Sequence, residues 1–242
     1  GIIPISYWWF NPVSEQAKNY RQPWDNSFIT HFLHKFNVDR IRTRKVVDQW
    51  IDHLGGACVN ILEALDRFKI HDKTLAIIGS GKPWIEAIAL NCNNMVTTVE
   101  YNEPVSTWPN LITENYFDFE KKQEKRYDCI ITFSSIEHSG LGRYRDPLDP
   151  FGDIKTMTAI RNNLKDDGVL IWGAPVGRDT LVWNAHRVYG EKRLPLLFAG
   201  FKKVDYIFDR SYESIINIIP INKKGTNGNI SQPVIILKKQ IL

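Results

Sequence analysis

Apolar positions along the chain follow two periods. Short runs of consecutive apolar residues are typical of parallel strands buried on both faces, and they predict strands at 75–78, 96–101, 127–133 and 169–173. Apolar residues three or four positions apart predict helices at 57–68, 84–91 and 153–164. Weaker patterns predict strands at 111–113, 201–208 and 233–237 and a short helix at 193–199. Alternating strands and helices predict an α/β fold with a Rossmann-like, doubly wound sheet, which binds ligands beyond the carboxyl ends of its strands.

The first 55 residues are irregular and then helical. A helix is expected to begin with Asn26 or Ser27 as its cap and to run through Phe36, and a second helix is expected over 44–54. We therefore divide the chain into an amino-terminal extension or cap, residues 1–55, and a Rossmann-like domain, residues 56–242. A chain of 242 residues is long enough to bury the core of one such domain.

A glycine turn follows the first strand of the predicted sheet. The sequence Gly79-Ser-Gly-Lys-Pro-Trp84 lies between the strand at 75–78 and the next helix. Gly79 and Gly81 allow the backbone to approach a ligand closely. Glu100 ends the second strand, where nucleotide-binding βαβ units place the carboxylate that holds the ribose hydroxyls. This arrangement predicts a site for a cofactor that contains adenosine.

The residues of this turn favour S-adenosylmethionine over other adenosine cofactors. A dinucleotide fingerprint has a third glycine where this chain has Trp84, and a phosphate loop has Ser or Thr where it has Pro83. Nucleoside triphosphates are therefore disfavoured, and this turn is expected to bind the pyrophosphate of NAD less well. S-adenosylmethionine carries no phosphate, so two glycines and a ribose carboxylate suit it better. The alternative is a glycine-turned corner that holds no ligand.

Composition excludes several other classes of protein. Hydrophobic residues at 43% and charged residues at 24% are typical of a globular protein. The net charge of +4, with no base-stacking motif, argues against a nucleic-acid partner. Three cysteines predict no disulfide framework, and no segment has the roughly 18 apolar residues that span a bilayer. The chain begins with Gly1, and an anchor ahead of it would place the protein in the Golgi or secretory lumen; the compartment and oligomeric state otherwise stay open.

Three further segments carry a resemblance to a known family. They are Ser-Ile-Glu-His-Ser-Gly-Leu-Gly-Arg-Tyr at 135–144, Asp-Pro-Leu-Asp at 146–149 and Trp-Asn-Ala-His-Arg-Val-Tyr-Gly at 183–190. With the glycine turn, they make the chain resemble class I S-adenosylmethionine-dependent methyltransferases. More narrowly, the chain resembles a nematode-type, methyltransferase-like family known as a domain of unknown function. Residues 75–200 carry nearly all of the resemblance, and the narrower family implies no chemistry.

The general resemblance implies how the two predicted strand ends would hold the cofactor. Gly79 and Gly81 would line its methionine portion. Glu100 would accept hydrogen bonds from the ribose, and Tyr101 would flank the adenine. These four residues form the expected core of the cofactor site.

The resemblance also implies roles at the third and fourth strands. Asp118 and Phe119 resemble the acid and its neighbour that hold the adenine amine, and Ser134 and Ser135 stand where sulfonium and substrate meet. One departure concerns the residue two positions before the first glycine. Many such enzymes have an acid there, whereas this chain has Ile77, which favours a degenerate, non-catalytic domain.

Two histidines are candidates for the catalytic base. His138 follows the fourth strand closely, and His186 lies in a predicted loop after the fifth strand, with Asn184 and Arg187 beside it as substrate contacts. Methyl transfer from a sulfonium to a hydroxyl needs an aligned nucleophile and often a base, and histidine titrates near neutral pH. Packing or a backbone hydrogen bond within the loop is the alternative for each histidine.

The segment 139–152 is long for a simple connector and predicts a lid or binding loop. Arg143 and Tyr144 are candidates to contact a polar or anionic acceptor, or they are ordinary surface residues. The acids of this region would suit a divalent metal, but turns and helix capping explain Asp146 and Asp153 better, so a metal is possible and is not the favoured interpretation.

The sequence therefore predicts an S-adenosylmethionine-dependent methyltransferase that acts on the hydroxyl of a small molecule or glycan. The hydroxyl acceptor rests on the two histidines and on the lack of a reactive cysteine constellation. One alternative is a non-catalytic, methyltransferase-like binding domain, which Ile77 favours. A second is an NAD-dependent oxidoreductase, which Glu100 allows and Trp84 disfavours.

Overall fold

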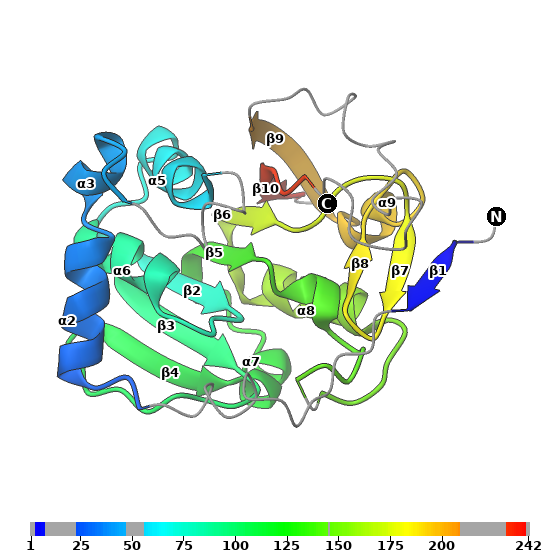
Figure 1. The fold of residues 1–242 in the computed structure, drawn as a ribbon, viewed down its shortest axis with the longest axis horizontal. Helices are drawn as coiled ribbons and strands as arrows, with labels where there is room; N and C mark the ends of the chain where they lie inside the picture. The colour runs from blue at the N-terminus through cyan, green and yellow to red at the C-terminus, as the bar shows by residue number, and fades with distance from the viewer. Residues whose placement is uncertain (1–2, 8–22, 47–55, 145, 209–230, 241–242) are drawn as a thin grey trace.

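A central sheet organises the chain in a computed structural model, which describes residues 3–7, 23–46, 56–144, 146–208 and 231–240 (Figure 1). Among these residues, seven strands pair in the order β4-β3-β2-β5-β6-β10-β9. Strands β2 to β6 are parallel, and β10 is antiparallel to both of its neighbours. The strands are β2 (Thr74–Ile78), β3 (Met95–Glu100), β4 (Leu111–Asn115), β5 (Tyr127–Phe133), β6 (Leu164–Gly173), β9 (Phe201–Ile207) and β10 (Val234–Lys239). The predicted α/β, doubly wound fold with a helical amino-terminal part is confirmed.

Helices cover both faces of this sheet, as the alternating chain order predicts (Figure 1). One layer contains α2 (Asn26–Lys35), α3 (Val38–Arg42), α5 (Ala57–Arg67) and α6 (Trp84–Asn91). The other contains α7 (Tyr116–Lys121), α8 (Gly152–Asn163) and α9 (Leu194–Leu197). In β2, Leu75 and Ile77 join the apolar cluster of the first layer, and Ala76 and Ile78 join that of the second. A strand whose successive side chains enter two cores must be apolar throughout.

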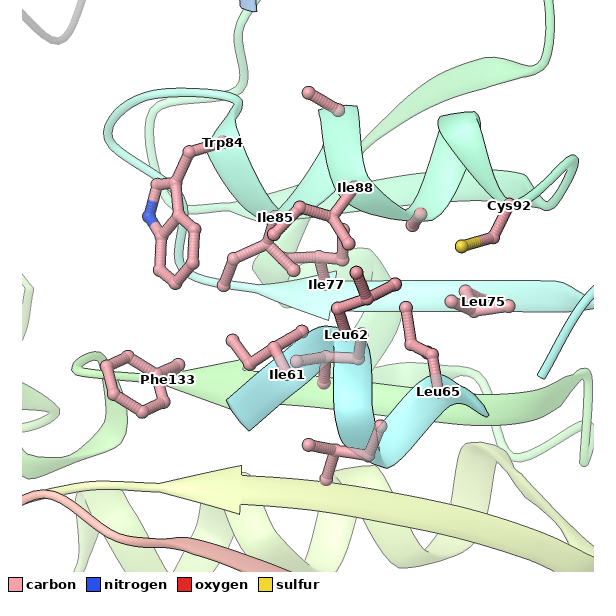
Figure 2. Close-up of a cluster of buried hydrophobic side chains, with 14 of the residues drawn as sticks. Ile61, Leu62, Leu65, Leu75, Ile77, Trp84, Ile85, Ile88, Cys92 and Phe133 are labelled. Atoms are coloured by element: carbon pink, nitrogen blue, oxygen red, sulfur yellow. The ribbon is translucent and has the colours of Figure 1, made fainter. Parts of the chain in front are cut away.

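Figure 2 shows the cluster under α5 and α6, where Leu62 and Ile85 point toward Ile77 on β2. All three side chains are at most 2% exposed, so Ile77 is a core residue. Trp84 lies at the edge of the same cluster with its ring 5.9 Å from that of Phe133, edge to face. An aromatic side chain packs here, at the position where a dinucleotide fingerprint has a glycine.

A second, smaller sheet lies beside α8 and α9 (Figure 1). Its order is β1-β7-β8, with β1 (Ile5–Tyr7) parallel to β7 (Thr180–Trp183) and β7 antiparallel to β8 (His186–Val188). The sequence did not predict this sheet, because strands of three or four residues leave too short an alternation to recognise. His186 is therefore in a strand, and its prediction as a loop residue was wrong.

Several element boundaries differ from those expected. Asp25, and neither Asn26 nor Ser27, caps α2, because its carboxylate accepts a hydrogen bond from the N–H of Phe28 at 2.8 Å. Residues 44–46 lie outside any helix, and 47–54 lie outside the described residues. The expected turn at Asp167-Gly168 lies inside β6, where the pairing with β5 shifts register.

A short 3-10 helix, η1 (Ile136–His138), follows β5, and α7 follows β4 directly. Both were missed because each is shorter than two helical turns. Within the part of the chain that the structure describes, no helix is long and apolar enough to cross a membrane.

Candidate active site

The glycine turn after β2 brings two strand ends into contact. Gly79 has φ +77°, which glycine adopts without strain, and a Cβ atom there would lie 1.8 Å from the Ser135 side-chain oxygen. Ser135 follows β5, so the carboxyl ends of two adjacent parallel strands meet at this glycine. Gly81 is half-buried in the same turn. The glycine at position 79 is therefore required by the contact with Ser135, and close approach of this turn to a ligand stays a prediction.

Glu100 lies at the carboxyl end of β3, directly beside the turn. Its carboxylate accepts a hydrogen bond from the backbone N–H of Ser80, and the residue is partly exposed. Desolvation raises the pKa of Glu100 to about 7, against the opposing effect of the Ser80 N–H. The acid expected at the end of the second strand is therefore held against the glycine turn.

Tyr101 continues from Glu100 and stacks on the aromatic residues of α7. Its ring centroid lies 4.5 Å from that of Tyr116 and 5.5 Å from that of Phe117. Asn115, at the carboxyl end of β4, donates to the Tyr101 carbonyl oxygen at 3.3 Å. The sequence analysis did not propose Asn115, which lies two residues after the strand predicted at 111–113 and ends the observed strand β4.

Asp118 and Phe119 lie on opposite faces of α7. Asp118 is exposed, whereas Phe119 is wholly buried, with its ring 6.3 Å from that of Tyr127. Helical residues one position apart do not face the same side, so only the Asp118 side chain is exposed. The adenine contact that the resemblance implies for Asp118 and Phe119 stays a prediction.

Ser134 and Ser135 connect the turn to a buried polar cluster. The Ser134 hydroxyl donates to Glu137 Oε1 at 3.2 Å and accepts from Gln232 at 3.4 Å. Ser134 has φ +53°, which directs the chain from β5 into η1. Gln232, which precedes β10, had no local signal in the sequence, because only the sheet order places it here.

His138 and His186 lie together, as neighbouring rings 6.3 Å apart and edge to face. His138 Nδ1 lies 2.6 Å from the Ala185 carbonyl oxygen, which also accepts from Arg143 at 3.0 Å. The carbonyl oxygen has no proton to give, so Nδ1 carries the ring proton and Nε2 carries the lone pair. His138 Nε2 lies 3.4 Å from Glu137 Oε1.

Burial keeps both histidines neutral. Desolvation, and then the charge of Arg143, lowers the pKa of His138 well below its ordinary value and that of His186 to about 4. His186 Nε2 is buried and has no hydrogen-bond partner among the described residues. Each ring therefore presents an uncharged nitrogen near neutral pH.

Glu137 is a further buried acid next to these histidines. It is 1% exposed, and desolvation raises its pKa to about 7, while the Ser134 hydrogen bond and Arg143 act in the other direction. Its second oxygen, Oε2, has no hydrogen-bond partner among the described residues. A buried carboxyl with one such oxygen is unusual outside functional sites.

Arg143 and Tyr144 lie against the histidine pair. The Tyr144 ring is 5.5 Å from that of His138, and the Arg143 guanidinium is 5.2 Å from the Tyr144 ring centroid. Asn184, in the turn between β7 and β8, is buried. The structure thus brings together four of the residues proposed for catalysis and substrate contact: His138, Arg143, Tyr144 and His186.

Arg187 has a different environment from its neighbours. It is 4% exposed and donates to the Ser139 carbonyl oxygen at 2.6 Å, and its Nε lies 3.7 Å from the Asp153 carboxylate. These contacts hold the loop after η1 to β8. The geometry supports a positioning role for Arg187 more than a direct substrate contact.

The acids of the loop after η1 make contacts within the protein. Asp146 accepts hydrogen bonds from the N–H groups of Gly140, Gly142 and Tyr144 at 2.7–3.2 Å, as a turn requires. Asp153 does not cap α8; it is wholly buried and pairs with Arg193. Across the described ranges, no group of three or more metal-ligating side chains is arranged to hold a metal ion.

A cavity of about 300 Å³ lies between the second sheet and the loop after η1. Its lining is mainly apolar and includes Leu141, Leu181, Trp183 and Val188. The cavity is large enough for part of a small molecule.

The order of the seven strands, with β10 antiparallel beside a parallel sheet and a glycine turn after β2, defines a class I methyltransferase fold. The chain belongs to the family described as Caenorhabditis protein of unknown function, DUF268, whose model matches residues 72–240. The resemblance to a nematode-type, methyltransferase-like family is confirmed.

Solved structures share this fold. The 1,6-didemethyltoxoflavin-N1-methyltransferase of Burkholderia thailandensis, with bound 1,6-didemethyltoxoflavin and S-adenosylhomocysteine, is 16% identical. The match covers 88% of this chain and 89% of that one, with a TM-score of 0.56. A TehB-like methyltransferase from Corynebacterium glutamicum is 14% identical, with 75% and 88% covered and a TM-score of 0.48. Comparison with curated protein sequences gave no significant match. At these identities the likeness shows the fold.

Proposed function

We propose that this protein is an S-adenosylmethionine-dependent methyltransferase that acts on a hydroxyl group of a small molecule or glycan. The observation that carries the proposal is the meeting of three parallel strand ends: Gly79 after β2, Glu100 at β3 and Ser135 after β5. Ligands of this class of sheet bind beyond the carboxyl ends of the strands. The Burkholderia enzyme of the same fold holds S-adenosylhomocysteine, which supports the same cofactor class here.

The residues around the turn fit the cofactor. Glu100 would accept hydrogen bonds from the ribose hydroxyls, and the backbone at Gly79 and Gly81 would lie along the methionine portion. Tyr101 would flank the adenine, with its ring already supported by Tyr116. Ser134 and Ser135 would lie near the sulfonium, and Asp118 with its neighbour Phe119 would hold the adenine amine.

The two histidines supply the base for a hydroxyl acceptor. S-adenosylmethionine would supply an electrophilic methyl group when bound. A neutral imidazole nitrogen would accept the proton of the acceptor hydroxyl during this transfer. His186 fits this role better than His138, because its Nε2 has no partner among the described residues while His138 Nε2 lies beside Glu137.

The nature of the acceptor follows from the surroundings of the histidines. Arg143 and Tyr144 offer a cation and an aromatic ring beside His138. These features favour a small molecule that combines a hydroxyl with a polar or aromatic part. If the intact protein carries an amino-terminal anchor, a glycan in the secretory lumen is the acceptor to test first.

Transfer of a labelled methyl group to a panel of hydroxyl compounds tests the chemistry. We expect His186→Asn to lower turnover by about 100-fold or more with unchanged cofactor affinity, as for loss of a general base. His138→Asn should have a smaller effect, and His71→Asn, on the surface beside Asp66, is the matched control. Full turnover in both active-site variants would overturn the assignment of the base.

A non-catalytic binding domain is the second candidate, and Ile77 favours it. Ile77 is wholly buried in the apolar core and supplies no carboxylate to the cofactor's amino group. Such a domain would bind S-adenosylhomocysteine without methylating any acceptor. Binding of NAD in its place would instead support an oxidoreductase, which the packing of Trp84 disfavours.

A further inference from the structure

Glu86 is a carboxylic acid enclosed by the glycine turn and α6. It is the third residue of α6, where an acid usually accepts a hydrogen bond from the N–H of the helix cap. The cap of α6 is Pro83, which has no N–H. Glu86 instead turns inward, is 0% exposed, and contacts Thr98 Oγ1 and Ser80 Oγ, each at 2.9 Å.

Counting hydrogens assigns the protonation state of this acid. The Ser80 hydroxyl lies 2.9 Å from both the Lys82 carbonyl oxygen and Glu86 Oε2, but it has one hydrogen. A protonated Glu86 satisfies every group: its O–H donates to Ser80, Ser80 donates to Lys82, and Thr98 donates to Glu86 Oε1. With an ionised Glu86, the Ser80 hydrogen points to Glu86, so the Ser80 and Lys82 oxygens lie 2.9 Å apart with no hydrogen between them. The Lys82 carbonyl oxygen accepts from the Trp84 N–H at 2.8 Å in either case.

The same serine links Glu86 to the cofactor site. The Ser80 backbone N–H donates to the Glu100 carboxylate, which is the group proposed to hold the ribose. A side chain that fixes Ser80 therefore fixes the orientation of this N–H and the shape of the glycine turn. Ile77 leaves no acid at the end of β2, so Glu86 is the buried acid nearest in sequence to the turn.

We propose that Glu86, in its protonated form, is the positioning residue of the cofactor site, acting through Ser80 on the glycine turn and on Glu100. This inference rests on the proposed function. The local sequence does not indicate this role, because the partners of Glu86 come from the turn and from β3.

The groups around Glu86 fit a neutral acid. Desolvation raises the pKa of Glu86 to about 7, the hydroxyls of Ser80 and Thr98 oppose this, and the charge of Glu100 on β3 adds to it. The helices α2 and α5, which pack against α6, contribute apolar residues such as Phe36 and Leu62 to this layer. Ionisation of Glu86 would therefore place a second negative charge near Glu100 in a layer that these helices fill with apolar side chains.

The test is calorimetric titration of the full chain with S-adenosylhomocysteine at pH 6 and pH 8. Glu86→Gln donates to Ser80 and accepts from Thr98 as the protonated acid does, whereas Glu86→Leu does neither. At pH 6, the Kd of Glu86→Gln should match that of the wild type, and that of Glu86→Leu should be about tenfold higher, equal to about 1.4 kcal/mol. At pH 8, Glu86→Gln should bind more tightly than the wild type by a similar factor.

Two results would overturn this inference. In the first, Glu86→Gln binds S-adenosylhomocysteine as weakly as Glu86→Leu at pH 6. In the second, the ratio of the Kd of the wild type to that of Glu86→Gln is the same at pH 6 and pH 8. If the wild type binds no S-adenosylhomocysteine at either pH, the proposed function fails separately. The role of Glu86 is then read from urea unfolding. If Glu86 is protonated, the free energy of unfolding of the wild type should fall as the pH rises, and it should fall less in Glu86→Gln. Identical pH profiles for the two proteins would contradict a protonated Glu86.

Discussion

Gly79 is restricted to glycine by its backbone and by its neighbour. Its φ of +77° lies in the left-handed region, and a Cβ atom would overlap the Ser135 side chain. Gly56 has nearly the same φ, +76°, with nothing within 4 Å of a Cβ atom. The two glycines therefore separate the cost of backbone strain from the cost of a steric clash.

We predict that Gly79→Ala destabilises the protein more than Gly56→Ala does. The backbone term is about 1–2 kcal/mol at either site, and the clash at Gly79 adds about 1–3 kcal/mol. Gly79→Ala should also abolish binding of S-adenosylhomocysteine, because the turn must move away from Ser135. Chemical denaturation and calorimetry measure both effects, and equal destabilisation of the two variants would show that the close contact at Ser135 is not needed.

Among the helices and strands, those with long apolar patterns were the ones that the sequence predicted well. The helix at 84–91 was predicted with the bounds it has, and Ile77 and its neighbours in β2 were predicted as a strand buried on both faces. The pattern is strong there because two layers of helices require continuous apolar residues.

Contacts between distant elements were not predictable from one sequence. The pairing of β1 with β7 joins residues 5–7 to residues 181–183, and no local signal indicates it. Likewise Glu86 and Gln232 reach the site through side-chain contacts with Ser80 and Ser134, which only the folded chain shows. The glycine turn and Glu100 were predictable because they lie within one βαβ unit.

The ion pair between Asp153 on α8 and Arg193 before α9 ties the second sheet to the main domain. Its closest N–O distance is 2.6 Å, Asp153 is 0% exposed, and Tyr189 donates to the same carboxylate at 3.1 Å. Removing one partner of a buried pair leaves an uncompensated charge. We predict that Asp153→Ala lowers the free energy of unfolding by about 3–5 kcal/mol, measured by urea denaturation.

Asp166→Ala is the matched control for this prediction. Asp166 also contacts two cationic side chains, Lys125 and Lys239, but it is half-exposed, so water screens the pairs. This variant should leave stability close to that of the wild type. Similar losses in the free energy of unfolding of the two aspartate variants would show that burial does not make the Asp153 pair more important for stability.

At the scale of the whole molecule, buried acids near the sheet's carboxyl end make stability depend on pH. Burial raises the pKa of Glu86, Glu100 and Glu137 from an ordinary 4.5 to about 7. Each acid stays protonated to a higher pH in the folded chain than in the unfolded chain. Its contribution to stability is complete below pH 4.5 and is lost as the pH rises through 7.

The buried histidines act in the opposite sense and over a lower range. The pKa of His186 falls from 6.5 to about 4, so its contribution is lost as the pH falls from 6.5 toward 4. Above pH 6.5 the acids act alone. We predict that the free energy of unfolding falls by on the order of 1–2 kcal/mol between pH 6.5 and pH 8.

Urea unfolding across this range measures the effect. A Glu86→Gln, Glu137→Gln double variant should lose most of the pH dependence, whereas Glu63→Gln, at the surface of α5 beside Arg67, should keep it. A profile that is flat in the wild type would mean that these acids are ionised in the folded protein at neutral pH.

Calorimetric titration of the full chain with S-adenosylhomocysteine, with NAD as a second ligand, measures whether the glycine turn and Glu100 form the cofactor site. We expect micromolar binding of S-adenosylhomocysteine, no comparable binding of NAD, and loss of affinity by about tenfold or more in Glu100→Ala, about 1.4 kcal/mol. Glu124→Ala, an exposed acid distant in sequence from the turn, should bind as the wild type does. No binding of S-adenosylhomocysteine, or equal affinity in the Glu100 variant, would contradict the assignment of the cofactor site.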